Sequence, residues 1–339
     1  MEDLEVNGWH GRRVFVTGAT GLLGSWLTEA LQARGATVVC LVRDWVPSSR
    51  LFESPASERA IVVRGELEDY PLLIRALNEY EIDSVFHLGA QTIVGIAGVS
   101  PLSTFEANIK GTWNLLEACR VCSSRIERIL VASSDKAYGI HDTLPYTEQT
   151  ALEGRYPYDV SKSCADLIAL SYFHSYGLPV AITRCGNLFG GGDLNFNRLV
   201  PGTIRSTLLG EPTVIRSNGR LVREYFYVRD AVEACLGLAA RLPDSSCIGH
   251  AFNIGSEQPV SVGDLVQQIL RLMGRTDLVP VVLDQARGEI PEQYLDCAKA
   301  HRVLGWRPRY SLEQGLRETI DWYSQRHPAN VPAGIASPR

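Results

Sequence analysis

The sequence predicts an α/β protein with a doubly wound parallel sheet and a smaller α/β lobe in its C-terminal part. Three observations predict this fold class. Short runs of β-branched residues alternate with amphipathic stretches through the first half, and these runs are continuously apolar. After Gly190 the expected elements become shorter, and prolines and glycines separate them. Continuous apolar strands are typical of parallel sheets that helices cover on both faces.

The first half is expected to alternate strands and helices. Its strands are predicted at 13–17, 37–42, 61–64, 84–88, 128–132 and 179–183. Its helices are predicted at 22–34, 70–80, 104–121 and 156–176. We therefore expect a first domain over 1–186, a smaller lobe over 187–330 that is threaded partly back onto it, and a flexible tail at 331–339.

The composition excludes several classes of protein. The 339 residues are 45% hydrophobic and 21% charged, with a formal net charge of −5, which is near the globular average. Charges of both signs are spread along the chain, so no basic stripe favours nucleic acid or an anionic membrane. The opening stretch is acidic and polar rather than a secretory signal, and no apolar run reaches the roughly 18 residues of a membrane span. We expect a cytoplasmic protein.

Eight cysteines are spread along the chain, and we expect them to be reduced and mostly buried. Cys119 and Cys122 form the one suggestive pair, because their spacing also occurs in metal and redox sites. A zinc site needs a second pair of cysteine or histidine ligands, and no histidine lies near this one. Packing at the end of a helix is the favoured interpretation, and no metal is expected.

A glycine motif follows the first predicted strand and opens the first predicted helix. It reads Gly18-Ala-Thr20-Gly21-Leu22-Leu23-Gly24. Gly18 and Gly21 permit a tight turn and a close approach of the backbone to a ligand, and Gly24 lets helix and strand pack closely. The helix N-terminus then attracts a pyrophosphate. The motif predicts a Rossmann-type dinucleotide site, although a structural glycine-rich turn is the alternative.

The choice of dinucleotide depends on Arg43 and Asp44, which follow the second predicted strand. A carboxylate there accepts hydrogen bonds from the adenosine ribose and favours NAD, whereas an arginine can bind the additional phosphate of NADP. The sequence contains both residues, so NAD is favoured and NADP stays possible.

A tyrosine and a lysine, Tyr158 and Lys162, are spaced so that they share one face of a predicted helix. A nearby cation lowers the pKa of a phenol, which would make Tyr158 a base for a substrate hydroxyl. Ser134 follows the strand predicted at 128–132, where side chains reach the ligand crevice and can orient that hydroxyl. The alternatives are a solvated Tyr158–Lys162 pair, and a turn or surface ion pair formed by Asp135 and Lys136.

These residues and their spacing resemble the extended short-chain dehydrogenase/reductases that act on nucleotide sugars, and the resemblance covers residues 9 to about 325. Further stretches that carry it are Gly65-Glu-Leu-Glu-Asp69, His87-Leu-Gly-Ala-Gln91, Asn108-Ile-Lys-Gly-Thr112, Arg184-Cys-Gly-Asn187 and Tyr227-Val-Arg-Asp230. Within this family the sequence is most similar to the CDP-glucose 4,6-dehydratases, through Gly24-Ser-Trp-Leu27, Ser133-Ser-Asp-Lys-Ala-Tyr138, Gly186-Asn-Leu-Phe-Gly-Gly-Gly-Asp193, Arg198-Leu-Val-Pro201 and Leu295-Asp-Cys-Ala-Lys299.

The resemblance implies a lyase that recycles its cofactor. Tyr158 would take the proton of the sugar 4-hydroxyl while NAD accepts the C4 hydride, and Asp135 would protonate the departing C6 hydroxyl. Lys136 stands where dTDP-glucose enzymes have a glutamate that serves as the C5 base. Lys136 can act as a base only if burial lowers its pKa; otherwise it stabilises the enolate and another group removes the C5 proton. We favour direct participation.

The resemblance also implies binding residues. The expected cofactor residues beyond the glycine turn are Arg43, Asp44, Glu66, Leu67, Leu88, Ala90, Asn108, Tyr158 and Lys162. The expected substrate residues are Gln91, Ser134, Asn187, Arg198, Leu199, Arg223 and Glu292. Arginine suits a diphosphate because its planar fork binds two phosphate oxygens, although Arg198 and Arg223 could instead be surface charges. The nucleotide base is not identified by any spacing.

Two helices of relatives form a dimer interface, which predicts a homodimer or a dimer of dimers. The apolar residues of the corresponding stretches are Trp113, Leu115, Leu116, Leu167, Ile168 and Leu170, and each could equally pack within its own subunit. An epimerase or decarboxylase of the same family is the alternative enzyme, and Asp135 favours a dehydratase because an epimerase has no use for an acid at C6. A non-catalytic dinucleotide-binding scaffold would not need Ser134, Tyr158 and Lys162 together.

Overall fold

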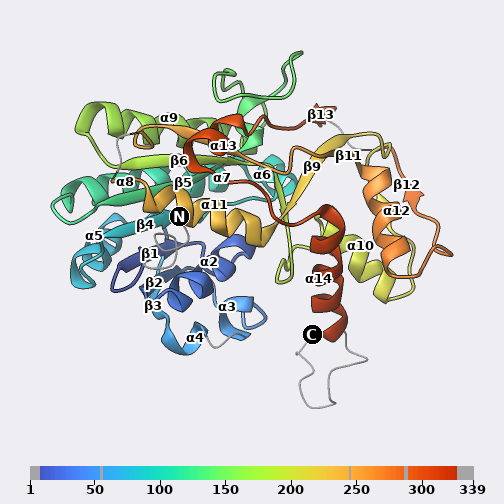
Figure 1. The fold of residues 1–339 in the computed structure, drawn as a ribbon, viewed down its shortest axis with the longest axis horizontal. Coiled ribbons are helices and arrows are strands. Elements are labelled where there is room, and N and C mark those ends of the chain that lie inside the picture. The colour runs from blue at the N-terminus through green and yellow to red at the C-terminus, as the bar shows by residue number, and fades with distance from the viewer. Residues whose placement is uncertain (1–7, 54–55, 244–245, 286–288, 327–339) are drawn as a thin grey trace.

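The computed structural model describes residues 8–53, 56–243, 246–285 and 289–326. Its main feature is a seven-stranded parallel sheet in the order β3-β2-β1-β4-β5-β6-β10 (Figure 1). The strands are β1 (Arg13–Thr17), β2 (Thr37–Val42), β3 (Ile61–Arg64), β4 (Ser84–His87), β5 (Arg128–Ser134), β6 (Val180–Cys185) and β10 (Ala251–Ile254). The predicted α/β fold class is confirmed.

Helices cover both faces of this sheet, because alternate residues of each strand point to opposite sides. Val14 and Val16 of β1 pack with α2 (Leu22–Ala33) and α11 (Val228–Ala240), whereas Phe15 packs with the helices of the other face. Those helices are α5 (Tyr70–Glu79), α8 (Gly111–Val121) and α9 (Pro157–Tyr176). Burial on both faces explains why the strands are continuously apolar.

The C-terminal part of the chain forms a second, smaller α/β unit. In its sheet, β9 (Val222–Tyr227) pairs with β7 (Asn187–Phe189), β11 (Pro259–Ser261) and β13 (Glu292–Gln293), and a separate pair joins β8 (Val214–Ile215) to β12 (Val281–Val282). Its helices are α10 (Leu199–Leu208), α12 (Val262–Leu272) and α14 (Leu312–Gln325), whereas α13 (Ala298–Leu304) packs against β10 in the core of the large sheet. Strand β10 leaves this part of the chain to pair with β6 in the large sheet. The tail predicted at 331–339 lies outside the described residues.

Short helical segments complete the first half: α3 (Arg50–Glu53), α4 (Ala56–Arg59), α6 (Val94–Val99) and α7 (Pro101–Phe105). The range predicted as a helix at 104–121 is helical throughout, but a π-helical turn over Glu106–Lys110 lies within it, between α7 and α8. Such turns often occur at functional sites. This one contains Asn108, whose side chain accepts from the amide of Gln91 and donates to Ser161.

The structure also corrects the expected dimer surface. Leu115 and Leu116 are completely buried in the core beneath the large sheet, so they cannot contribute to an interface between subunits. Ile168 and Leu170 pack partly against the same core. Trp113 and Leu167 are 44% and 56% exposed, and their role in a dimer interface stays a prediction. The physical reason is that α8 and α9 turn most of their apolar residues towards their own sheet.

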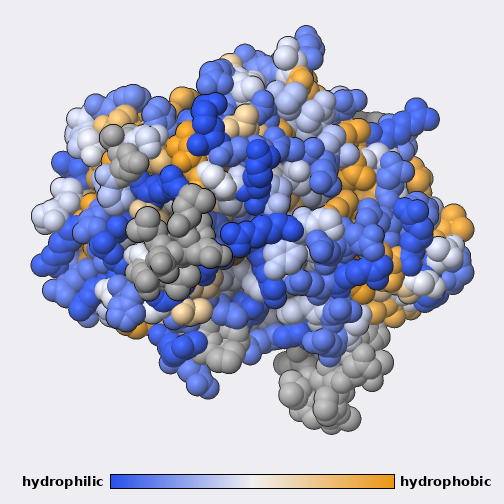
Figure 2. Space-filling model, in the orientation of Figure 1, coloured by the Kyte–Doolittle hydropathy of each residue, from blue (hydrophilic) through white to orange (hydrophobic). Residues whose placement is uncertain are grey.

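The surface carries mixed polarity. Figure 2 shows a largely hydrophilic face, with hydrophobic side chains gathered towards the side on which α12 and β12 lie in Figure 1. The exposed apolar residues of this region include Val279, Val281, Val282 and Leu283. Within the described ranges, none of the helices is both long and apolar enough to cross a bilayer.

Candidate active site

The glycine turn forms a cradle without side chains at the carboxyl end of β1. Gly18 has φ +72°, and a Cβ there would lie 2.7 Å from the amide nitrogen of Gly89. A Cβ on Gly24 would lie 2.1 Å from the Gly18 carbonyl oxygen. No side chain caps the start of α2 at Gly21, so the N-terminus of the helix is suited to an anion. The cradle therefore fits the pyrophosphate of a dinucleotide.

The other residues of the turn have different surroundings. The Thr20 carbonyl accepts a hydrogen bond of 2.8 Å from Ser49. Leu22 is buried with Phe189 and Val228 in the core of the C-terminal unit, and Leu23 packs partly against the same core. The expected contact of Leu22 with a cofactor is therefore restricted to its backbone, because its side chain joins the two parts of the fold.

Arg43 and Asp44 form an ion pair with each other at the end of β2, with 2.7 Å between Nε and Oδ2. Their side chains are 61% and 64% exposed. The arginine thus already has a carboxylate partner, while Asp44 keeps a second oxygen. The pair supports neither cofactor decisively by its own geometry.

The remaining expected cofactor residues mostly lie around the cradle. Gly89 and Gly111 both approach Leu67, since a Cβ on either glycine would lie within 3.2 Å of that side chain. The amides of Leu88 and Gly89 donate to Thr17 at the end of β1. Ala90 follows them and precedes Gln91, whose amide is held by Asn108. Glu66 lies beside Leu67 after β3.

A buried histidine that sequence reasoning missed supports this edge of the sheet. The Thr17 hydroxyl already accepts from two amides, so it donates to Nδ1 of His87 at 2.9 Å. Nε2 of His87 then carries the hydrogen and donates to Thr112 at 2.9 Å, whose hydroxyl donates to the Asn108 carbonyl. Burial lowers the pKa of His87 to about 3. The neutral imidazole therefore links the cradle to the π-helical turn.

The turn after β5 holds the candidate acid. Ser134 donates to Oδ1 of Asp135 at 2.9 Å and accepts from the Lys136 amide. Asp135 is 2% exposed, and its Oδ2 has no hydrogen-bond partner among the described residues. Burial raises the pKa of Asp135, which Lys136 and Ser134 oppose. Burial favours the neutral form of a carboxyl, which is the form that can donate a proton.

Tyr158 lies in the first turn of α9 and is 8% exposed. Burial raises the pKa of Tyr158 to about 12, whereas the Arg198 cation and a hydrogen bond with Ser134 lower it. Lys162 is not among the main groups that act on this pKa, and its predicted effect on Tyr158 stays a prediction. The Lys162 ammonium donates to the Ala132 carbonyl at 2.9 Å, and burial lowers the pKa of Lys162 to about 8.

Arg223 is buried and Lys136 half-buried in one charged cluster, so neither residue is a surface charge. Lys136 donates to Oε1 of Gln293 at 2.7 Å. Arg223 is 5% exposed, donates to the Val222 carbonyl at 2.8 Å, and contacts Glu289 at 3.3 Å. Burial lowers the pKa of Lys136, and Arg223 lowers it further. The carboxylates around Lys136 act in the opposite direction.

The expected substrate residues have varied environments. Arg198 bridges two loops, with 2.9 Å to Asp193 and 2.8 Å to Thr92. Asn187 donates to the Glu224 carbonyl. Leu199 begins α10 and packs partly against the core of the C-terminal unit. Glu292 is exposed, whereas its neighbour Gln293 is fully buried; because strand side chains alternate in direction, Gln293 is the one that meets the charged cluster.

Two buried carboxyls near the cluster were also missed by sequence reasoning. Asp159 is 4% exposed, and burial raises its pKa to about 6. Glu224 is fully buried on β9, and burial raises its pKa to about 8. A Cβ on Gly186 or Gly255 would lie 2.8 or 2.3 Å from Oε1 of Glu224. The run Arg223-Glu-Tyr was a signal for Glu224, because Asp or Glu in a continuous buried strand is unusual.

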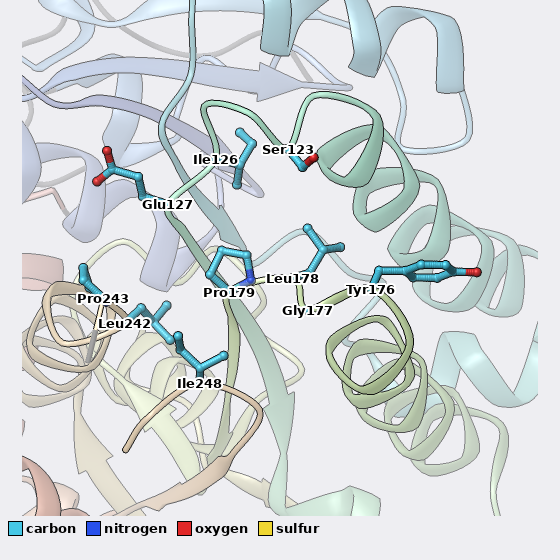
Figure 3. A pocket seen from close by; sticks show the side chains of 10 residues that line it. All are labelled: Ser123, Ile126, Glu127, Tyr176, Gly177, Leu178, Pro179, Leu242, Pro243 and Ile248. Carbon is cyan, nitrogen blue, oxygen red and sulfur yellow. The ribbon is translucent and has the colours of Figure 1, made fainter. Parts of the chain in front are cut away.

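A separate cavity of about 420 Å³ lies at the opposite edge of the sheet (Figure 3). It is lined by Ile126, Tyr176, Leu178, Leu242 and Ile248, among others, near the starts of β5 and β6. Ser134 and Cys185 end those same strands, so the cavity and the charged cluster lie at opposite edges. Cys119 and Cys122 are free and buried near this edge, as the packing interpretation predicts.

The fold and this site define a protein of the GDP-mannose 4,6 dehydratase family: the family matches residues 15–319, and the chain belongs to it. Among its relatives is the CDP-glucose 4,6-dehydratase of Salmonella typhimurium, 31% identical over 94% of this chain and 92% of the relative. The structure of dTDP-glucose 4,6-dehydratase from Streptomyces venezuelae with NAD bound has a TM-score of 0.84 at 28% identity, covering 92% of this chain and 97% of that one.

Epimerases are equally similar in fold. The UDP-glucose 4-epimerase of Thermotoga maritima, solved with UDP-glucose, has a TM-score of 0.85 at 27% identity and covers 93% of this chain and 99% of its own. The expected resemblance to extended short-chain dehydrogenase/reductases of nucleotide sugars is therefore confirmed. The choice between dehydratase and epimerase depends on the chemistry of the site.

Proposed function

We propose that the protein is a nucleotide-sugar 4,6-dehydratase that converts an NDP-hexose, with CDP-glucose as the first candidate, to the 4-keto-6-deoxy sugar for deoxysugar biosynthesis. Asp135 is the observation that carries this proposal. Its carboxyl is buried beside Ser134, has a raised pKa, and leaves one oxygen without a partner in the described part of the chain. An epimerase needs no proton donor at C6, whereas a dehydratase must convert the C6 hydroxyl to water.

NAD is the proposed cofactor, and the glycine cradle with the start of α2 would hold its pyrophosphate. NAD supplies a reversible oxidation of the sugar at C4 and returns the electrons at C6. Three observations support the choice: the fit of the cradle, the Asp44 carboxylate that remains available to a ribose, and the NAD bound to the Streptomyces venezuelae relative. NADP stays the alternative, because Arg43 lies beside Asp44.

The chain's own residues perform the proton transfers. Tyr158 takes the proton of the sugar 4-hydroxyl, and Ser134 orients that hydroxyl while bonding to the phenol. Arg198 lowers the pKa of Tyr158 against the effect of burial, so its cation favours the phenolate. Asp135 then protonates the C6 hydroxyl as it leaves. Burial excludes water from these groups, which strengthens each electrostatic interaction.

The substrate's diphosphate is proposed to meet Arg198 and Arg223, whose guanidinium groups suit phosphate oxygens. Each arginine forms an ion pair with a carboxylate, Arg198 with Asp193 and Arg223 with Glu289. These ion pairs keep the two cations in place before the substrate arrives. We further propose a cytoplasmic homodimer that uses the exposed Trp113 and Leu167.

The experiment is incubation of the protein and NAD with CDP-, dTDP-, UDP- and GDP-hexoses. A dehydratase yields a product that is lighter by one water and absorbs ultraviolet light in base, whereas a 4-epimerase yields an isomer of unchanged mass. Deuterium placed on C4 should appear on C6 of the product. An isomer of unchanged mass from every sugar, or deuterium that never reaches C6, would refute the proposal.

A further inference from the structure

Asp159 is a buried carboxylate beside the proposed acid and base that the mechanism above does not use. It follows Tyr158 in the first turn of α9 and is 4% exposed. This turn packs against the segment Asp135–Tyr138, where Ser163 of α9 donates to the Ala137 carbonyl at 2.8 Å. Its charged neighbours are Lys136 and Asp135 on that segment, and Glu289 before β13. Asp159 therefore belongs to the same cluster as the acid.

The reaction needs a base for the C5 proton, and the other members of the cluster fit that role poorly. Asp135 is the proton donor. Burial lowers the pKa of Lys136, but the neighbouring carboxylates oppose that shift and favour its cation. As an ammonium that donates to Gln293, Lys136 has no electron pair to accept a proton. Glu289 is paired with Arg223, and its side chain is 41% exposed. Glu224 has a pKa raised to about 8 by burial, so it keeps its proton at neutral pH. Asp159 remains as the buried carboxylate beside Tyr158 and the segment that carries Asp135.

We propose that Asp159 is the base that removes the C5 proton and that Lys136 stabilises the resulting enolate. This inference rests on the proposed dehydratase function. The C5–H bond breaks, the proton moves to the Asp159 carboxylate, and the electron pair forms the C4–C5 double bond of the enolate. When the C6–O bond breaks, that pair forms the C5–C6 double bond, and Asp135 supplies the proton that makes water. Asp159 later returns its proton to C5.

The electrostatics of the cluster suit both roles. Burial raises the pKa of Asp159 to about 6, while Lys136 opposes this rise. A base with a pKa just below neutral is charged at neutral pH and still accepts a proton readily. The Asp159 and Glu289 carboxylates favour the Lys136 cation, which in turn favours an anionic oxygen on C4.

The structural alternative is that Asp159 only caps its helix. Its carboxylate accepts a hydrogen bond from the backbone of Tyr156, the N-cap of α9. Asparagine retains an oxygen for this hydrogen bond but cannot take a proton. The substitution Asp159→Asn therefore separates the two roles.

The test uses the protein loaded with NAD, together with whichever of the four NDP-hexoses the unaltered protein dehydrates. Rapid mixing measures reduced nicotinamide, which reports oxidation at C4. Mass spectrometry measures deuterium uptake from D₂O at C5 of the isolated 4-keto-6-deoxy product, a partial reaction that needs only the C5 base. We expect Asp159→Asn to form reduced nicotinamide but to slow C5 exchange about 100-fold or more.

Two further variants keep the outcome clear. Asp159→Glu keeps a carboxylate and should exchange C5 at least about 10-fold faster than Asp159→Asn. Asp264→Asn makes the same acid-to-amide change in the first turn of another helix, α12, and should stay within about threefold of the unaltered protein. The inference would be overturned if Asp159→Asn exchanged C5 at the rate of the unaltered protein. It would also be overturned if Asp159→Glu and Asp159→Asn slowed C5 exchange equally. Failure of the unaltered protein to reduce nicotinamide with any sugar would instead overturn the proposed function.

Discussion

The ammonium of Lys136 donates a 2.7 Å hydrogen bond to the side-chain oxygen of Gln293, which lies 157 positions further along the chain. This contact joins the turn after β5, in the large sheet, to β13 in the small one. In this hydrogen bond Lys136 is the donor. The contact connects the segment that contains the proposed acid, Asp135, to the unit that contains the proposed substrate arginines. Water exclusion and positioning at this site therefore depend on both parts of the fold.

Replacing the proposed acid should separate the two halves of the reaction. Asp135→Asn removes the proton donor while keeping the size of the side chain, so C4 oxidation should proceed and loss of water should slow about 100-fold or more. Rapid-mixing absorbance should show reduced nicotinamide that accumulates and persists. Unchanged turnover would eliminate Asp135 as the acid.

Removing the phenol of Tyr158 should abolish the first oxidation itself. Tyr158→Phe leaves the sugar 4-hydroxyl without a base and leaves Ser134 without its phenol partner. We expect turnover to fall by at least about 100-fold. Absorbance of reduced nicotinamide after rapid mixing is the measurement, and its appearance at the normal rate would refute the role of Tyr158.

Filling the glycine cradle should prevent cofactor binding. The Cβ of Gly24→Ala would lie 2.1 Å from the Gly18 carbonyl oxygen, so α2 and the turn must separate. We expect the Kd for NAD, measured by titration of tryptophan fluorescence, to rise at least about tenfold, or 1.4 kcal/mol.

A matched glycine provides the control for that substitution. A Cβ on Gly237 in α11 meets nothing within 4 Å among the described residues, and alanine favours a helix. Gly237→Ala should therefore raise the free energy of unfolding by about 0.5–1 kcal/mol and leave NAD binding unchanged. Equal NAD affinity in the two variants would contradict the proposed cradle.

The buried Glu224 should make stability depend on pH. Its pKa is about 8 in the folded protein, against 4.5 as the ordinary value. Between these pH values the unfolded carboxyl loses a proton that the folded one keeps, so the free energy of unfolding falls as the pH rises from 4.5 to 8. In the unaltered protein the free energy of unfolding should fall by a few kcal/mol across this pH window, and Glu224→Gln should remove that fall.

Chemical denaturation of both proteins at pH 5 and pH 8 checks this expectation. The free energy of unfolding of Glu224→Gln should exceed that of the unaltered protein most at pH 8, where the buried Glu224 carboxyl is partly charged. Denaturation curves that shift in parallel at both pH values would show that Glu224 is not the titrating group.

The sequence by itself determined the features that a few neighbouring residues encode. Strands β1, β2 and β3 have the predicted limits, since continuous apolar runs between polar turns identify buried strands locally. The glycine motif, the Tyr158–Lys162 spacing and the family were equally readable. The helix predicted over 104–121 is present, but its pattern did not indicate the π-helical turn within it, where Asn108 contacts Gln91 and Ser161.

Only the tertiary structure decided the electrostatic character of the site. Gln293 meets Lys136, Asp159 joins Asp135, and Tyr158 has a raised rather than a lowered pKa. A pKa depends on how completely water is excluded and on which charges are brought close. Those charges come from strands and turns far apart in the chain, and no local pattern specifies their meeting.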